Sequence, residues 1–141
     1  MSITASPRPS LADVIASSPV RPIGIEVHVL HYDMIPPGMT GDFAMIFDGR
    51  EATVVSSAPE RLREARESGR GIEGPFAGIR LEISDSFGAD GFIATATTAC
   101  AEAGVGAYLL STFSYDYLFV APHHLDTALA ALRGAGFPLG D

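Results

Sequence analysis

The segment VGAYLLSTFSYDYLFVAPHHLDTALAALRGAG (Val105–Gly136) has the pattern of a β-hairpin followed by a helix. Three aromatic residues, Tyr115, Tyr117 and Phe119, alternate with Asp116, Leu118 and Val120, which is typical of a strand with two distinct faces. The Ala-Pro pair after this strand indicates a helix start, because proline in the first helical turn gives up an N–H that has no partner there. We therefore expect strand, turn, strand and helix, with the helix ending near Gly136.

An earlier part of the chain repeats this pattern, in GDFAMIFDGREATVVSSAPERLREARESG (Gly41–Gly69). Ala44 aligns with Ala107 and Leu62 with Leu125, and both copies carry Ala-Pro just before the helix. The identity is low, but the same elements recur in the same order at a constant offset. We interpret the two segments as an internal duplication.

Each hairpin follows another candidate strand, at Ile23–Leu30 and at Gly78–Ile83. In the second copy a helix is expected at Asp90–Ala103, with Asp90 as its N-cap. In the first copy the corresponding stretch contains Pro36-Pro37-Gly38, which breaks helices. The second copy therefore has a helix that the first copy lacks.

These elements predict an α+β protein with a ferredoxin-like fold, built of two tandem βαββαβ-type units of which the first lacks its first helix. The expected domains are a degenerate unit at residues 23–77 and a second unit at residues 78–141. Residues 1–22 are expected to be a loose N-terminal segment, with a short lead-in helix as the alternative. The strand assignment stays open for residues 71–76 and 137–141.

Composition excludes several classes of function. The chain is 47% hydrophobic, has a formal net charge of −8 and contains no lysine, so it has neither a P-loop nor a Schiff-base lysine. Arginine and glutamate alternate in residues 60–67, the pattern of a solvated helix face, and no basic patch for nucleic acid is present. No apolar run is long enough to span a membrane, no secretion signal is recognisable and there is one cysteine, so we expect a cytoplasmic protein.

The motifs that resemble catalytic or metal sites have simpler interpretations. Gly69–Gly74 matches G-x-G-x-x-G, but a helix precedes it and a strand follows, which is the reverse of a dinucleotide site. His123 and His124 are adjacent and diverge on a helix, and Cys100 lies on an apolar helix face as a small core residue. We expect no cofactor, no metal and no enzymatic activity, because no acid, base or nucleophile is poised for catalysis.

Asp116 and the start of the helix at Asp90 are the candidates for a binding role. Asp116 shares a strand face with Leu118 and Val120, where a charge is costly unless it is paired. One interpretation is that Asp116 caps the strand start, and the other is that it receives a cationic group of a ligand. The helix start presents free N–H groups that attract an anion, and Asp90 capping its own helix is the alternative use of those groups.

Residues from about Asp90 to Phe137 resemble the closing half of tandem ACT-domain proteins, a set that includes small bacterial proteins and the cytosolic CASTOR arginine sensors. The resemblance rests on the helix ending Ala101-Glu102-Ala103-Gly104 and on the pattern that follows it, formed by Ser111, Thr112, Phe113, Asp116, Tyr117 and Val120. The chain departs from the family at residues 84–89, which lack its glutamate-glycine-proline.

The resemblance implies an ACT fold and a regulatory protein that binds an amino acid or a related metabolite. By position it implies a ligand site at Gly91, Phe92, Ile93, Thr112, Phe113 and Asp116. It thereby favours the ligand interpretation of Asp116. A protein-interaction or scaffold module of the same fold without a ligand is the alternative.

An aromatic strand face suggests self-association. Tyr115, Tyr117 and Phe119 lie opposite Asp116, and helices cover only one face of an open ferredoxin-like sheet. Aromatic residues are enriched at interfaces, so we expect a homodimer or higher oligomer. Coverage of this face within the chain is the competing interpretation, and neither nucleic acid nor membrane is expected as a partner.

Overall fold

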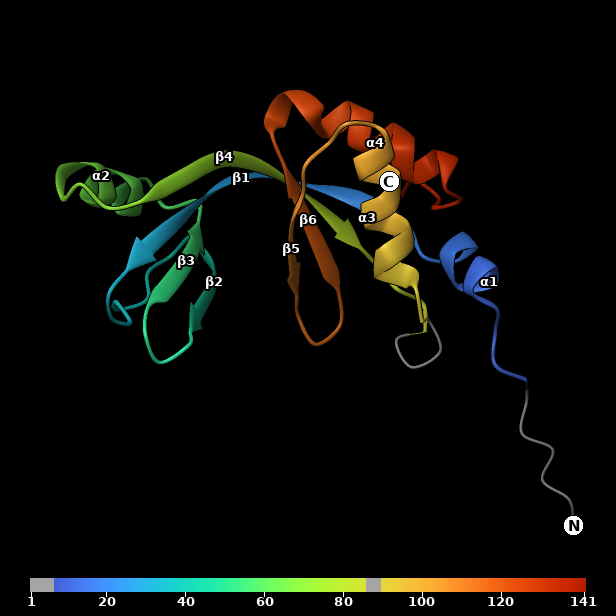
Figure 1. Cartoon of the computed structure of the whole chain (residues 1–141), viewed down its shortest axis with the longest axis horizontal. Coiled ribbons are helices and arrows are strands. Elements are labelled where there is room, and N and C mark those ends of the chain that lie inside the picture. Colours follow the sequence, from blue (N-terminus) through green and yellow to red (C-terminus); the bar gives the residue numbers. More distant parts are fainter. Residues whose placement is uncertain (1–6, 86–89) are drawn as a thin grey trace, which may run out of the picture. The chain divides into compact units, whose positions relative to one another are not determined.

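Both predicted hairpins and the helix expected after each of them are present (Figure 1). The first copy consists of strands β2 and β3 and helix α2, at Asp42–Phe47, Ala52–Ser56 and Pro59–Glu67. The second consists of β5, β6, a 3-10 turn η1 and helix α4, at Tyr108–Ser111, Asp116–Val120, Pro122–His124 and Leu125–Gly134. The two prolines differ in use, because Pro59 opens α2 directly whereas Pro122 opens the 3-10 turn ahead of α4.

The computed structural model describes residues 7–85 and 90–141, which form two compact units. We call Ile23–Gly78 the inserted unit. The terminal unit consists of the chain up to Pro22 together with Ile79–Asp141.

The inserted unit contains strands in the order β2-β3-β1-β4, with β1 at Val20–Tyr32 and β4 at Ile72–Leu81. β3 pairs antiparallel with both β1 and β2. Its core is small and joins the sheet to α2 through Leu30, Tyr32, Ala52, Val54 and Ala65. No helix lies between β1 and β2, as the Pro-Pro-Gly sequence predicts.

The terminal unit has the strand order β1-β4-β6-β5, with α3 (Phe92–Glu102) between β4 and β5. Helices α3 and α4 lie side by side against this sheet (Figure 1). The core between them includes Ile79, Leu81, Phe92, Ala96, Cys100, Leu118, Val120, Ala128, Leu132 and Phe137. Cys100 is therefore a core residue, as its place on the apolar helix face predicts.

The same ferredoxin-like order recurs in both units, in which the first strand lies between the last and the third. β1 is the first strand of the inserted unit, and its opening residues take the last-strand position of the terminal unit. β4 is the last strand of the inserted unit and supplies the first strand of the terminal unit. Each long strand thus contributes to both units.

Strand β4 settles the assignment that stayed open for residues 71–76. These residues and the strand expected at Gly78–Ile83 form one strand, because glycine at position 78 adopts extended backbone and does not end it. The C-terminal residues 137–141 form no strand of their own. A single parallel bridge joins Val20 to Leu139.

The N-terminal segment, expected to be loose over residues 1–22, is folded in its second half. A short helix, α1 (Leu11–Ala16), packs Val14 into the core of the terminal unit. Val20, which begins β1, is fully buried in the same core. Few apolar residues suffice for these contacts, so the Pro/Ser-rich composition concealed them. Residues 1–6 lie outside the described part.

Helix α3 begins later than expected, at Phe92 rather than Asp90. Its N-cap is Gly91, with φ at 89°, and no side chain caps the helix. Asp90 is exposed and is not the N-cap. The cap position belongs to Gly91, whose backbone lies in the left-handed region that favours glycine, whereas a capping aspartate takes extended backbone.

Candidate functional site

The turn between β5 and β6 is closed by its own hydrogen bonds. The backbone N–H of Thr112 donates to the Tyr115 carbonyl at 2.8 Å, and the Tyr115 N–H donates to Thr112 Oγ1 at 3.2 Å. Phe113 stands at the tip and is fully exposed. Thr112 is thus part of the turn structure, and Phe113 presents an aromatic ring to the surroundings.

Asp116 begins β6 and lies opposite Ser111 in the β5–β6 pair. The Ser111 hydroxyl donates a hydrogen bond to Asp116 Oδ1, which supports the capping interpretation. In residues 7–85 and 90–141 no arginine or histidine forms an ion pair with Asp116. Its carboxylate is therefore hydrogen-bonded but keeps an uncompensated charge.

A small hollow of about 180 Å³ lies beside this turn. Its wall is formed by the turn residues from Thr112 to Asp116 and by Ile83, which follows β4 in the chain. Polar atoms from Thr112, Ser114 and Asp116 thus meet an aliphatic side chain at one end of the sheet.

The start of α3 offers backbone groups rather than side chains. Phe92 is 2% exposed and makes an edge-to-face contact with Phe137 at a centroid distance of 5.4 Å. Ile93 is partly buried against the same core. Gly91 lines a separate hollow of about 400 Å³ with Leu11, Thr95 and other α3 residues. Only the N–H groups of the first turn are therefore suited to meet a ligand.

The two groups of predicted residues lie at the same end of the terminal unit. β4 ends, α3 begins and β5 turns into β6 at this end, as Figure 1 shows. The hollow at Asp116 and the hollow at Gly91 share no lining residue. Residues 86–89, which connect β4 to α3 and include part of the family departure at 84–89, lie outside the described residues.

The aromatic strand face is largely buried within the single chain. Phe119 is 0% and Tyr117 is 9% exposed, and their rings stack at 6.4 Å. Tyr115 is 38% exposed, and the Arg80 guanidinium lies 5.3 Å from the centroid of its ring. The expectation of an open aromatic face was wrong for Tyr117 and Phe119, so these two rings give no reason for an oligomer.

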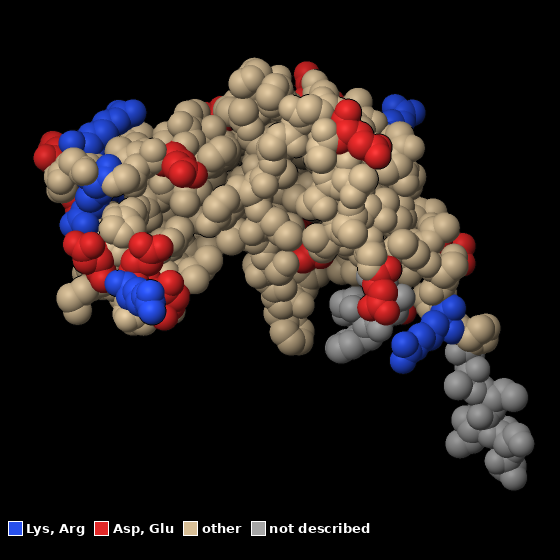
Figure 2. Space-filling view, viewed as in Figure 1, with Lys and Arg blue, Asp and Glu red and all other residues tan. Residues whose placement is uncertain are grey.

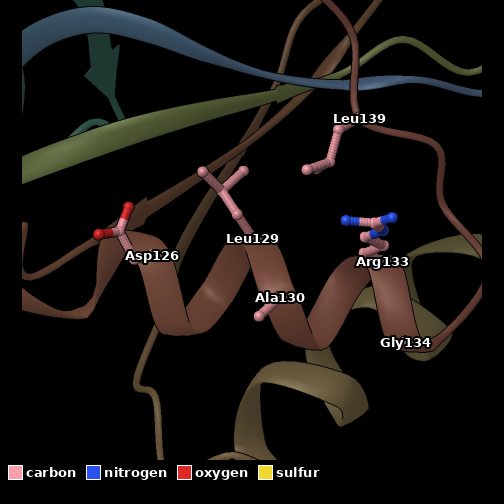
Figure 3. A pocket seen from close by; sticks show the side chains of 6 residues that line it. All are labelled: Asp126, Leu129, Ala130, Arg133, Gly134 and Leu139. Carbon is pink, nitrogen blue, oxygen red and sulfur yellow. The ribbon is translucent and has the colours of Figure 1, made fainter.

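A third hollow, of about 600 Å³, lies between α4 and the C-terminal segment (Figure 3). Leu129 and Leu139 project into it from opposite sides, and Asp126 and Arg133 stand at its two ends. Both charged residues are exposed. The hollow contains none of the predicted residues and no buried polar group among its lining, so it is not our candidate for ligand recognition.

The inserted unit holds a buried ion pair that the sequence did not reveal. Arg61 is 1% exposed and donates to both carboxylate oxygens of Asp42, at 3.0 and 2.6 Å, and to the Pro37 carbonyl. These hydrogen bonds hold the pKa of Asp42 far below its usual range and raise the pKa of Arg61. The interpretation of Arg61 as part of a solvated helix face was wrong. The available signal was its spacing of one turn from Ala65, which faces the core.

Tyr32 lies next to this pair and was also missed. The guanidinium carbon of Arg70 is 4.5 Å from the centroid of the Tyr32 ring, and that of Arg61 is 5.5 Å from it. Tyr32 and Arg70 line a hollow of about 380 Å³ with the loop after β1. The adjacency comes from the α2–β4 connection, which no local sequence pattern predicts.

The described ranges 7–85 and 90–141 contain no group of three histidine, cysteine or acidic residues near enough to one another to hold a metal ion. Acidic and basic side chains alternate over the inserted unit on the face in Figure 2, and no extended basic area is seen there. Within those same ranges no helix has the length and apolar character to cross a membrane.

Comparison of the sequence with protein-family models and with curated proteins gives no match. Comparison of the fold gives several solved structures. A protein of unknown function from Vibrio cholerae has a TM-score of 0.68 at 20% identity, over 90% of this chain and 96% of its own. A protein from Agrobacterium tumefaciens has a TM-score of 0.71 at 16% identity, over 87% and 92%.

The regulatory subunit of aspartate kinase from Thermus thermophilus shares the fold as well. Its TM-score is 0.61 at 14% identity, over 82% of this chain and 95% of that subunit. The whole aspartate kinase of Clostridium acetobutylicum matches over 84% of this chain but only 34% of the enzyme. These similarities confirm the predicted fold class: the chain has the α+β, ferredoxin-like fold of the ACT-type regulatory domains of aspartate kinase.

Proposed function

We propose that this protein is a non-enzymatic regulatory protein that binds a small amino acid or a related metabolite at the Asp116 end of the terminal unit. The observation that carries the proposal is Asp116 itself, a carboxylate beside a hollow with no basic side chain paired to it in the described residues. The fold shared with the regulatory subunit of aspartate kinase supports a regulatory role.

The predicted site residues would contact opposite charges of the ligand. The ligand carboxylate would accept hydrogen bonds from the N–H groups of Gly91, Phe92 and Ile93, at the positive end of the α3 dipole. The ammonium or a basic side chain of the ligand would meet Asp116, and Thr112 and Phe113 would border it in the hollow at the turn. Phe92 would contribute only its backbone, because its side chain belongs to the core.

A thermal-shift screen against the twenty amino acids tests this proposal. A ligand that binds only the native state raises the unfolding midpoint in a concentration-dependent way. We expect one amino acid, or a few of similar shape, to do so. If none of them raises the midpoint at millimolar concentration, the amino-acid proposal fails.

A scaffold module without a ligand is the second candidate, and Phe113 favours it. Its ring is fully exposed at the tip of a hydrogen-bonded hairpin turn, a suitable anchor for a protein partner. The thermal screen separates the two candidates: a ligand sensor shows a raised midpoint with an amino acid, whereas a scaffold shows none and loses its partner in Phe113→Ala.

We also propose that the protein self-associates and works in the cytoplasm. The outer strands β2 and β5 carry exposed apolar side chains, Ile46, Phe47 and Leu109, next to unpaired edge backbone. The buried single cysteine suits a reducing compartment. Light scattering at micromolar concentration would contradict self-association if the mass were near 14.8 kDa.

A further inference from the structure

The hollow of about 380 Å³ in the inserted unit is lined in part by Tyr32 and Arg70, whose side chains stack on each other. Tyr32 is 3% exposed, since the Arg70 guanidinium lies over its ring at 4.5 Å. All the lining residues belong to the inserted unit. The hollow is therefore independent of the Asp116 site and of the function proposed for it.

Two buried hydrogen-bond donors of residues that line this hollow have no partner in the described parts of the chain. They are the Tyr32 hydroxyl and Nε of Arg70. Arg61 lies close to the same ring, but its hydrogen bonds go to Asp42 and to the Pro37 carbonyl. Buried donors without acceptors are costly and rare in native proteins, and a ligand that brings an acceptor removes the cost.

Arg70 also keeps the other donors of its guanidinium largely available. Its closest carboxylate is Glu64, at 3.9 Å from Nη2, which is too long for a hydrogen bond. A guanidinium presents parallel N–H groups that match the two oxygens of a carboxylate. The guanidinium of Arg70 therefore fits a carboxylate.

The walls of the hollow indicate the chemistry of the part of the ligand beyond its carboxylate. Met34 is 77% and Ile35 is 56% exposed, and both line the hollow beside Pro36. Such aliphatic side chains favour an apolar body. Asp33 and Glu64 also line it and disfavour a second negative charge.

We propose that this hollow binds a small monocarboxylate with an apolar body, its carboxylate on Arg70 and the Tyr32 hydroxyl. Isovalerate is a suitable probe, isovaleramide is its uncharged match and succinate carries the second charge. Binding is followed by NMR of the ¹⁵N-labelled full chain, at the Arg70 Nε–Hε resonance assigned by its loss in Arg70→Lys. We expect a saturable shift with isovalerate and none with isovaleramide or succinate.

Two variants test the assignment by calorimetry. Tyr32→Phe keeps the stacked ring and removes only the unpartnered hydroxyl. Arg70→Lys keeps the positive charge and removes the parallel N–H donors of the guanidinium. Each should weaken isovalerate binding by about tenfold. Arg63→Lys, on the exposed side of α2, is the matched control and should bind like the parent.

The unfolding midpoint without ligand separates binding from structure. Tyr32→Phe should unfold at the same or a higher temperature than the parent, because a buried unsatisfied group is gone. No shift at Arg70 with isovalerate, an equal response to isovaleramide, or unchanged affinity in Tyr32→Phe would each overturn the proposal. Tyr32→Phe keeps the test decisive if Arg70→Lys does not fold.

Discussion

Ser111 and Asp116 face each other across the β5–β6 pair, and the serine hydroxyl donates a 2.5 Å hydrogen bond to Asp116 Oδ1. The bond orients the carboxylate at the end of the hairpin. Because serine is neutral, it leaves the negative charge uncompensated. A ligand cation would meet a carboxylate that is already positioned, which lowers the entropic cost of binding.

Asp116→Ala should weaken binding of the amino acid found in the thermal screen by about ten- to a hundredfold, the effect of losing a charge-assisted hydrogen bond of roughly 1.5–3 kcal/mol. Calorimetry on the folded variant measures this. Ser111→Ala is the matched control: it removes the orienting bond but keeps the charge, so its loss of affinity should be smaller. Equal affinity in parent and Asp116→Ala would place the ligand elsewhere.

Gly91→Ala should lower the free energy of unfolding by about 1–2 kcal/mol, because φ at 89° is strained for any residue with a side chain. The added carbon would lie 3.3 Å from the flexible end of Leu11, a lesser obstacle. Urea unfolding measures the change. Gly106→Ala, whose added carbon meets nothing within 4 Å and whose φ lies outside the left-handed region, is the control. A stability loss in Gly106→Ala equal to that in Gly91→Ala would argue against a special backbone at the helix start.

Asp42→Asn should destabilise the protein by about 3–5 kcal/mol, because Arg61 would stay buried without its counter-charge. Side-chain exposures of 2% for Arg61 and 13% for Asp42 place the pair inside the inserted unit. Chemical denaturation at neutral pH measures the loss. Asp126→Asn, on an exposed face of α4, should change stability little.

The same pair makes stability depend on pH. Hydrogen bonds from Arg61 depress the pKa of Asp42 in the folded state, so the unfolded state takes up the proton first as the pH falls. The contribution is therefore complete above about pH 4 and declines progressively below it. Asp42→Asn should lose this part of the acid slope. If the parent and the variant had parallel stability curves from pH 6 to pH 2, the pair would not be the cause.

Phe119→Ala should cost about 3–5 kcal/mol, because the ring is fully buried within one chain and its removal leaves a cavity. Tyr115→Ala, on the same strand face but 38% exposed, should cost much less. Thermal unfolding at several protein concentrations measures both. A cost for Phe119→Ala that vanished on dilution would mean that the face is covered by another copy.

Local signals predicted the hairpins and helices well, because alternation, Ala-Pro and glycine stops act over a few residues. The two hairpins, α2 and the absence of a helix after β1 followed from them. Features that depend on tertiary contacts were not predicted. Arg61 looks solvated among its charged neighbours, and only packing against Asp42 and Tyr32 makes it buried.

For the same reason, only part of the candidate site could be predicted from the sequence. Thr112, Phe113 and Asp116 fall in one turn, which the spacing of the strands predicts. The exact start of α3 depends on the left-handed backbone at Gly91, and aspartate at position 90 is an equally good cap by sequence. The hollow at Tyr32 joins residues far apart in the chain, so no local pattern could indicate it.

The shared use of β1 and β4 has a kinetic consequence. The inserted unit is one continuous stretch of chain, whereas the terminal unit must bring together residues on both sides of that stretch. Closing a loop of this length costs roughly 3–4 kcal/mol of chain entropy. If the inserted unit folds first, β1 and β4 are already neighbours and the closure is complete. Nucleation in the inserted unit, followed by docking of the termini, is therefore the faster route.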